Sequence, residues 1–243
     1  KCKNTNNVIK NKRVNQTTAQ KSVGANDNMR NEEMKTNVIP EPKVLPEQPP
    51  MPPMPMPPTP PKQPGEFLRE NGVLHMDKDF NQENCMPLVK MIMEYNLTPE
   101  KDAPKVIHLY INSPGGYVDS CMHLIDIVKQ SRIPVYTYGM GSIASCGVML
   151  MMAGQKGHRY LTQNTAVMSH EFSGGTRGQY HDMLDAQSHM EWTNQKLLEH
   201  YMKCTGKKEP YIRKHLLAPK TDHWLTPEEA VKHGIADVIV ETY

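Results

Sequence analysis

Thirteen of the 21 prolines in this 243-residue chain fall between Pro40 and Pro64. Because proline fixes its own φ and lacks a backbone donor, this stretch cannot lie inside a helix or a sheet. We expect it to sample extended polyproline II, either as a stiff spacer or as a ligand for an aromatic groove in a partner. We therefore predict a disordered Asn/Lys-rich and Pro-rich tail over residues 1–64 and one folded domain over residues 65–243.

Charge separates the same two regions. Residues 1–62 carry a net charge of +5 and the rest of the chain −3. A small positive excess in a tail with almost no aromatic residues does not indicate nucleic-acid binding. No run of 18 apolar residues is present, so no membrane span is expected.

The five cysteines are widely spread and form no CxxC pair. This spacing suggests neither a disulfide framework nor a zinc site. Reduced thiols are typical of the cytoplasm, which is the location we expect, with an organelle stroma or matrix as the alternative.

The pattern of apolar residues after residue 65 predicts alternating helices and strands. Order is expected to begin near Phe67, and apolar residues recur at helical spacing over Cys85–Tyr95. The alternation that follows, with short loops, indicates an α/β domain with a largely parallel sheet. The expected strands are Val106–Asn112, Pro134–Tyr138, Tyr160–Leu161 and Ala166–Ser169, and the expected helices are Val118–Gln130, Ser145–Ala153 and the long Gln179–Lys203.

Two glycine-containing junctions follow predicted strands. At Ile111–Gly116, adjacent glycines permit either a plain strand-to-helix turn or a loop whose N–H groups bind an anion or an oxyanion. Gly139–Gly147 superficially fits a dinucleotide fingerprint. That fingerprint needs an acidic residue about 20 positions on, and residues 153–164 contain none. We therefore expect no nucleotide cofactor.

A serine, a histidine and an aspartate, the residue types of a hydrolytic triad, lie at or near places where the predicted strands and helices begin or end. Ser145 begins an apolar helix, where N–H groups and the helix dipole favour developing negative charge, although a serine here is also an ordinary helix cap. His170 ends a strand before a glycine-rich loop and is the candidate base. Asp222, in a polar loop before the helix opened by Thr226 and Pro227, is the candidate acid that orients the base. A loop aspartate is also a common turn residue.

A metal site is the alternative for the histidines of the long helix. His181, Asp185 and His189 share one helix face, but a metal would need a fourth ligand from elsewhere. His170-Glu171 lacks a second histidine four residues after the first, so it is not a zinc-protease motif. We expect no metal.

Taken together, these segments resemble the ClpP family of self-compartmentalised serine proteases. The resemblance covers residues 67–241 and implies a ClpP/crotonase-like α/β fold of stacked ββα units, with Gln179–Lys203 as a protruding handle helix. The motifs that carry it are Ile111–Gly116, Gly141–Gly147, Val167–His170, Ala153–Tyr160, Gly178-Gln179, Thr205-Gly206 and Glu229–Asp237.

The resemblance also implies a role for each aligned residue. Ser145 would be the nucleophile, His170 the general base and Asp222 the orienting acid, with the N–H groups of Gly116 and Cys146 forming the oxyanion hole. The family implies a cofactor-free serine endopeptidase that cleaves peptides or unfolded polypeptides inside two stacked heptameric rings, which together form a tetradecamer. An ATP-dependent AAA+ unfoldase would feed it, and no P-loop occurs in this chain.

The chain departs from the family pattern at three places. Glu171-Phe172 stands where the family commonly has Gln-Pro, and the segment before Asp222, Leu216–Thr221, is a few residues longer than usual. The proline-rich arm replaces the family's axial loop, which puts the docking of an unfoldase in question.

Two other functions stay open on the sequence. A catalytically inactive ring subunit or assembly scaffold would share the fold. An acyl-CoA hydratase-type enzyme on the related crotonase-like fold would use oxyanion N–H groups without a Ser–His pair. Labelling of Ser145 by a fluorophosphonate tests the first alternative, and thioester binding, which we expect to be absent, tests the second.

Overall fold

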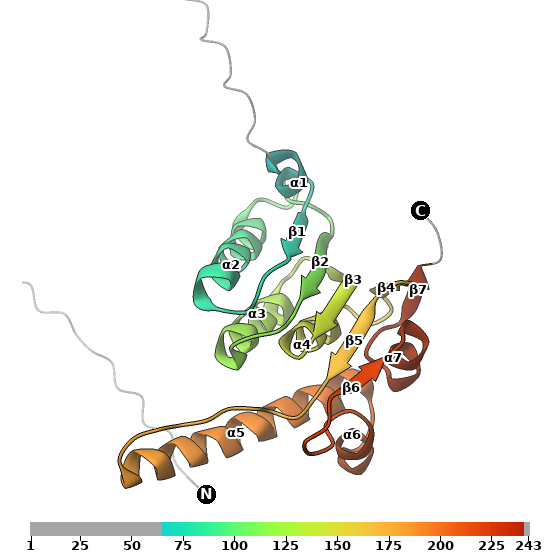
Figure 1. Ribbon diagram of the computed structural model, residues 1–243. Coiled ribbons are helices and arrows are strands. Elements are labelled where there is room, and N and C mark those ends of the chain that lie inside the picture. The colour runs from blue at the N-terminus through green and yellow to red at the C-terminus, as the bar shows by residue number, and fades with distance from the viewer. Residues whose placement is uncertain (1–64, 241–243) are drawn as a thin grey trace, which may run out of the picture. The chain divides into compact units, whose positions relative to one another are not determined.

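The computed structural model describes residues 65–240, so the predicted tail over residues 1–64 lies outside the described residues. Helices and strands alternate along the described part of the chain (Figure 1). The elements are α1 (Glu66–Glu70), β1 (Val73–Met76), α2 (Gln82–Leu97), β2 (Ile107–Ser113), α3 (Val118–Gln130), β3 (Val135–Ala144), α4 (Cys146–Ala153), β4 (Arg159–Thr162), β5 (Ala166–Ser169), α5 (Tyr180–Thr205), α6 (Glu209–His215), β6 (His223–Leu225), α7 (Pro227–His233) and β7 (Val238–Val240).

The strands of residues 65–240 form one seven-stranded sheet. The path β1-β2-β3-β4-β7 is parallel throughout, β5 pairs in parallel with β3, and β6 pairs antiparallel with β5. Parallel neighbours need long crossovers, which the intervening helices supply. The predicted α/β fold with a largely parallel sheet is confirmed.

Strand β3 is longer than the sequence predicted. Its expected end was Tyr138, but the strand continues to Ala144. It pairs with β4 as far as Gly139 and with β5 from Ser142 onward. Gly141 lies between the two pairings with φ +70, a conformation that glycine adopts without strain. This change of partner brings the ends of β3 and β5 together.

Helix α4 lies in the core of the described domain. All eight of its residues are buried, as expected for a helix that is apolar all round. It packs against α3, α5, β2 and β3. Because α4 begins directly after β3, Ser145 between them is held by buried structure on both sides.

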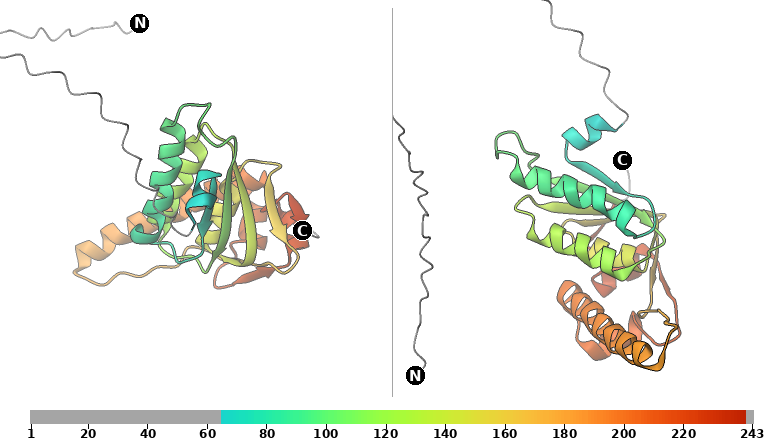
Figure 2. Two further views of the ribbon diagram at one scale, coloured as in Figure 1. Left: turned by 90° about the horizontal axis from the view of Figure 1, so that it is seen from above. Right: turned by 90° about the vertical axis from the view of Figure 1, so that its left-hand side faces the viewer.

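Helices α2 and α3 pack together on one side of the sheet (Figure 2). Helix α5 is buried only over its C-terminal half, through residues such as Leu197 and Tyr201. Its N-terminal half exposes Met183 and Leu184 and projects away from the sheet (Figure 1). Although α5 is long, no helix in residues 65–240 is apolar enough over a sufficient length to cross a membrane.

The opposite face of the sheet carries a ladder of aromatic rings. In β2, Ile107, Leu109 and Ile111 are buried and alternate with half-buried residues that face the other way. Consecutive strands β1 to β4 contribute stacked rings with centroids 4.7 to 5.2 Å apart, namely His75, Tyr110, Tyr138 and Tyr160.

A buried ion pair joins the end of the sheet to the end of α5. Arg159 at the start of β4 contacts Asp237 at 2.5 Å and donates to the carbonyl of Cys204 at 3.3 Å. Burial alone would raise the pKa of Asp237, but hydrogen bonds from Arg159 and its charge outweigh burial and lower that pKa. The pair fixes β7 and α5 against β4.

Candidate active site

Ser145 and His170 meet at the adjacent ends of β3 and β5. These strands are parallel, and Ala144 pairs with Met168, so the following residues leave the sheet at the same edge. The Ser145 N–H donates to the Met168 carbonyl at 2.8 Å. The Ser145 hydroxyl lies 2.8 Å from Nε2 of His170. The structure therefore brings the predicted nucleophile and base within hydrogen-bonding distance.

The backbone of Ser145 adopts an unusual conformation. Its φ of +54 and ψ of −115 lie in a region that non-glycine residues rarely occupy. The side chain makes no capping bond to helix α4, so the hydroxyl serves His170 instead. Positive φ at a non-glycine residue costs free energy and is retained where the surroundings hold it in place. Here the buried end of β3 (Ile143 and Ala144) and buried α4 provide that support.

The Gly115–Gly116 peptide is held by the backbone of Phe80. The Gly115 carbonyl accepts from the Phe80 N–H at 2.8 Å, and the Tyr117 N–H donates to the Phe80 carbonyl at 2.7 Å. A trans peptide directs its N–H opposite to its carbonyl, so the Gly116 N–H points away from Phe80. A Cβ at Gly116 would lie 2.5 Å from the Phe80 carbonyl oxygen, which excludes any larger residue.

The two loops that carry the predicted oxyanion donors are in direct contact. A Cβ on Gly115 would lie 2.8 Å from Cβ of Ser145. Behind them, the Cys146 thiol donates to the Gly116 carbonyl at 3.3 Å, and the Cys121 thiol donates to the Cys146 carbonyl at 3.4 Å. Cys146 is the first residue of α4, so its own N–H has no acceptor within the helix. Both predicted donors thus lie beside Ser145.

Asp222 lies opposite His170 without contacting it. In the antiparallel β5–β6 pair, Ser169 pairs with His223. One step further places Asp222 opposite His170, and residues directly opposite each other in such a pair share a face. Asp222 is nevertheless exposed, and its carboxylate makes no hydrogen bond with His170 among the described contacts. The assignment of Asp222 as the orienting acid stays a prediction.

A small hollow of about 40 Å³ adjoins the Ser–His pair. Met149, Leu197 and Tyr201 give it an apolar wall, while Glu171 and Phe172 line it from the segment after His170. Burial raises the pKa of Tyr201, so its hydroxyl stays protonated. That hydroxyl lies 2.9 Å from the Ser169 hydroxyl, which ties α5 to the end of β5.

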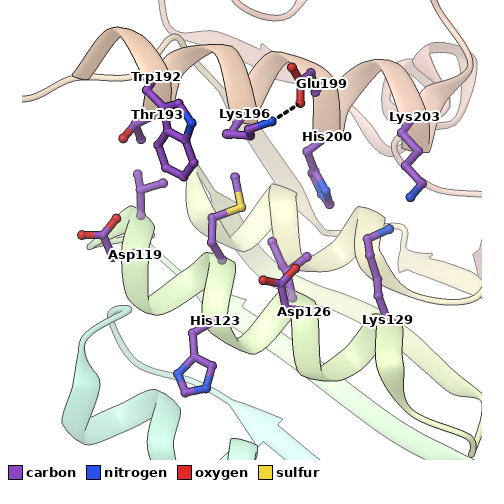
Figure 3. A pocket seen from close by; sticks show the side chains of 13 residues that line it. Asp119, His123, Asp126, Lys129, Trp192, Thr193, Lys196, Glu199, His200 and Lys203 are labelled. Carbon is purple, nitrogen blue, oxygen red and sulfur yellow. Dashed lines mark hydrogen bonds and ion pairs between the residues drawn. The ribbon is translucent and has the colours of Figure 1, made fainter. Parts of the chain in front are cut away.

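A separate groove of about 540 Å³ runs between α3 and α5 (Figure 3). Charged side chains of both helices line it, and Lys196 pairs with Glu199 at 2.8 Å. His200 faces this groove from α5 and contacts the Met149 carbonyl at 2.9 Å. Neither Ser145 nor His170 lines the groove, so the predicted chemistry is confined to the smaller hollow.

The residues considered for a metal do not form a site. His181, Asp185 and His189 are all exposed on α5. Within residues 65–240, no three His, Cys, Asp or Glu side chains come close enough to hold a metal ion.

Sequence reasoning missed the contribution of Phe80. It acts through its backbone N–H and carbonyl, which every residue except proline possesses. No side-chain pattern could therefore have identified it. The adjacent glycines at 115 and 116 were the usable signal, because they indicate a close backbone approach without naming the partner.

A family model described as Clp protease matches residues 68–243. The match includes every predicted site residue and the whole sheet. It agrees with the observed α/β fold. The chain belongs to the Clp protease family.

Proposed function

We propose that this chain is a serine endopeptidase that cleaves peptides or unfolded polypeptides through an acyl-enzyme. The observation that carries the proposal is the 2.8 Å separation between the Ser145 hydroxyl and Nε2 of His170. Within a family of Clp proteases, this contact supplies a nucleophile and a base in one place.

In the acylation step, His170 removes the Ser145 proton as Oγ attacks the scissile carbonyl carbon. The carbonyl oxygen becomes an oxyanion, which the N–H groups of Gly116 and Cys146 stabilise. The imidazolium then protonates the leaving amine, and the acyl group stays on Ser145. A water molecule, deprotonated by His170, hydrolyses the ester and restores the free hydroxyl.

The oxyanion donors support this mechanism because they are backbone groups held before substrate arrives. Phe80 fixes the Gly115–Gly116 peptide, and the start of buried α4 fixes Cys146. Donors that need no rearrangement are the effective ones, and losing one costs about 10²–10³-fold in kcat.

Ring assembly and an unfoldase partner follow from the family in general terms. We propose two stacked heptameric rings joined through the projecting half of α5, which exposes Tyr180, Met183 and Leu184. Unpaired apolar side chains on a protruding helix are suited to burial against another subunit.

An inactive ring subunit is the second candidate, and one observation favours it. Asp222 is exposed and makes no described hydrogen bond to His170. Without an oriented tautomer, the imidazole is a much poorer base. Such a subunit would assemble but would not hydrolyse peptides.

The deciding experiment treats the full-length, assembled protein with a fluorophosphonate probe and follows hydrolysis of a fluorogenic peptide and of an unfolded protein. We expect labelling and hydrolysis in the wild type and neither in Ser145→Ala. The matched control is Ser120→Ala, a half-buried serine on α3 that does not line the hollow beside Ser145 and lies outside the projecting half of α5; it should behave like the wild type. Mass measurement confirms that each variant assembles. An assembled wild type that is neither labelled nor active would establish the inactive subunit instead.

A further inference from the structure

The segment that leads to Asp222 is tied to the end of β5 at two points. The Ser169 hydroxyl donates to the Leu216 carbonyl at 2.8 Å. The Lys220 N–H donates to Oε1 of Glu171 at 3.0 Å. Ser169 and Glu171 flank His170 in sequence, so the residues on both sides of the predicted base hold the segment that carries the predicted acid.

The second tie acts at a strained turn. Lys220 has φ +58. Among the described residues, Ser145 and Lys220 are the two non-glycine residues with positive φ. A residue other than glycine in this left-handed region of φ and ψ costs free energy unless its surroundings compensate. The turn is closed by the Thr221 N–H, which donates to the Ala218 carbonyl at 3.3 Å. The Glu171 carboxylate supplies a charge-assisted hydrogen bond at the strained residue itself.

Asp222 lies two residues after Lys220 and immediately before His223, the first paired residue of β6. The conformation of the turn therefore determines the position of Asp222 relative to His170. A register change of one residue would move Asp222 to the other face of the ladder. The Glu171–Lys220 contact thus connects the residue that follows His170 with the loop that leads to Asp222.

We propose that Glu171 is a positioning residue for the catalytic acid. Its carboxylate holds the Lys220 turn in the left-handed conformation and so keeps Asp222 within reach of the His170 imidazole. This inference rests on the proposed function, because it assumes that Asp222 orients His170 during hydrolysis.

The test is a double-mutant cycle on full-length, assembled protein, with kcat and KM measured separately on a fluorogenic peptide. Glu171→Ala should lower kcat about tenfold with KM nearly unchanged, as expected when one hydrogen bond to a charged group is lost. Glu171→Gln keeps a carbonyl acceptor and should recover most of kcat. Glu209→Ala, which removes another exposed glutamate contact, to Arg213 on α6, should leave kcat unchanged.

The energetic coupling between Glu171 and Asp222 distinguishes a positioning role of Glu171 from a general contribution to the stability of the protein. Asp222→Asn should lower kcat about 10²-fold in the wild type but only about tenfold in the Glu171→Ala background, because interacting residues give non-additive effects. Equal effects of Asp222→Asn in both backgrounds would overturn the proposal, as would a Glu171→Gln variant no better than Glu171→Ala.

A second route covers the case in which Glu171→Ala fails to assemble. Glycine adopts positive φ without strain, so Lys220→Gly should remove the need for the tether. In the Lys220→Gly background, Glu171→Gln and Glu171→Ala should have equal kcat, and a large remaining difference would contradict the proposal.

Fluorophosphonate labelling of the wild type distinguishes failure of the proposed function from failure of the proposed role of Glu171. An unlabelled wild type refutes the proposed function, whereas a labelled, active wild type with an additive cycle refutes the role of Glu171 alone.

Discussion

The two halves of the candidate site are built in different ways. On the nucleophile side, Ser145 stands between the buried end of β3 and the fully buried helix α4, and the predicted oxyanion loop is held by backbone bonds of Phe80. On the acid side, exposed Asp222 follows a turn that a single side chain, Glu171, holds at Lys220. The side that carries the predicted nucleophile is thus fixed by main-chain packing. The side that carries the predicted acid depends, in our proposal, on a side-chain contact.

The largest effect is expected on the nucleophile side, from Gly115→Ala. The new Cβ would lie 2.8 Å from Cβ of Ser145 and 3.0 Å from the Ala144 carbonyl oxygen, in a residue whose φ is +100. We expect kcat/KM for a fluorogenic peptide to fall about 10³-fold, the effect of losing an oxyanion donor. Gly175→Ala, with open space around its Cβ, is the matched control. A Gly115→Ala enzyme within tenfold of wild type would mean that the two loops are not rigidly apposed.

Acid should weaken the nucleophile side through His200, which supports α4 at the Met149 carbonyl. Burial lowers the pKa of His200 to about 4, and the nearby charges of Lys129 and Lys203 act in the same direction. Between pH 6.5 and 4 the unfolded chain therefore binds a proton that the folded chain does not. Stability should fall over this window by about 3 kcal/mol at most.

The urea midpoint measured at pH 7.5 and pH 4.5 tests this expectation. His200→Gln should reduce the difference between the two midpoints, whereas His189→Gln, an exposed histidine on the same helix, should not. An unchanged difference in His200→Gln would assign the acid sensitivity to other groups.

On the acid side, Asp222→Asn should cost less than the changes at the nucleophile. We expect kcat to fall about 10²-fold, short of the ~10⁴-fold loss that follows when a firmly bonded orienting carboxylate is replaced. Steady-state kinetics on the assembled protein decide the matter. A loss as large as that of Ser145→Ala would show that Asp222 is held as firmly as the nucleophile and would remove the contrast between the halves.

The smallest effect is expected behind the oxyanion loop, at the Cys146 thiol. A thiol is a weak donor, so Cys146→Ala should lower kcat only about threefold, and Cys146→Ser should retain the contact with the Gly116 carbonyl. If Cys146→Ala is as active as wild type, the backbone bonds alone hold the loop.

The sequence predicted most about the site where a residue type at a given place in the fold has few structural explanations. The proximity of Ser145 and His170 is consistent with the prediction, which rested on a serine opening an apolar helix and a histidine ending a strand. The α/β class followed from the alternation of apolar segments. Asp222 was a weaker prediction, because a loop aspartate has many uses and the structure shows no contact between its carboxylate and His170 among the described residues.

Other features could not be predicted because they arise from pairing. Strands β1, β6 and β7, which have three or four residues each, were not predicted. Their length alone does not explain this, because β4 and β5 are about as short and were predicted. The existence of β1, β6 and β7 depends on neighbours far away in the chain. The change of partner within β3 depends likewise on both β4 and β5. The Glu171–Lys220 contact joins residues 49 positions apart, and neither residue alone indicates it.

The pairing order of the sheet has a consequence for synthesis on the ribosome. Ser145 and the strands beneath it emerge early, but the strand that brings Asp222 beside His170 is β6, which pairs only with β5. Domains form as units once their sequence is available. A nascent chain that ends at His170 therefore contains the predicted nucleophile and base but lacks Asp222 and the elements that complete the domain. If the chain is the peptidase proposed above, its activity begins only after α6 and β6 have left the ribosome.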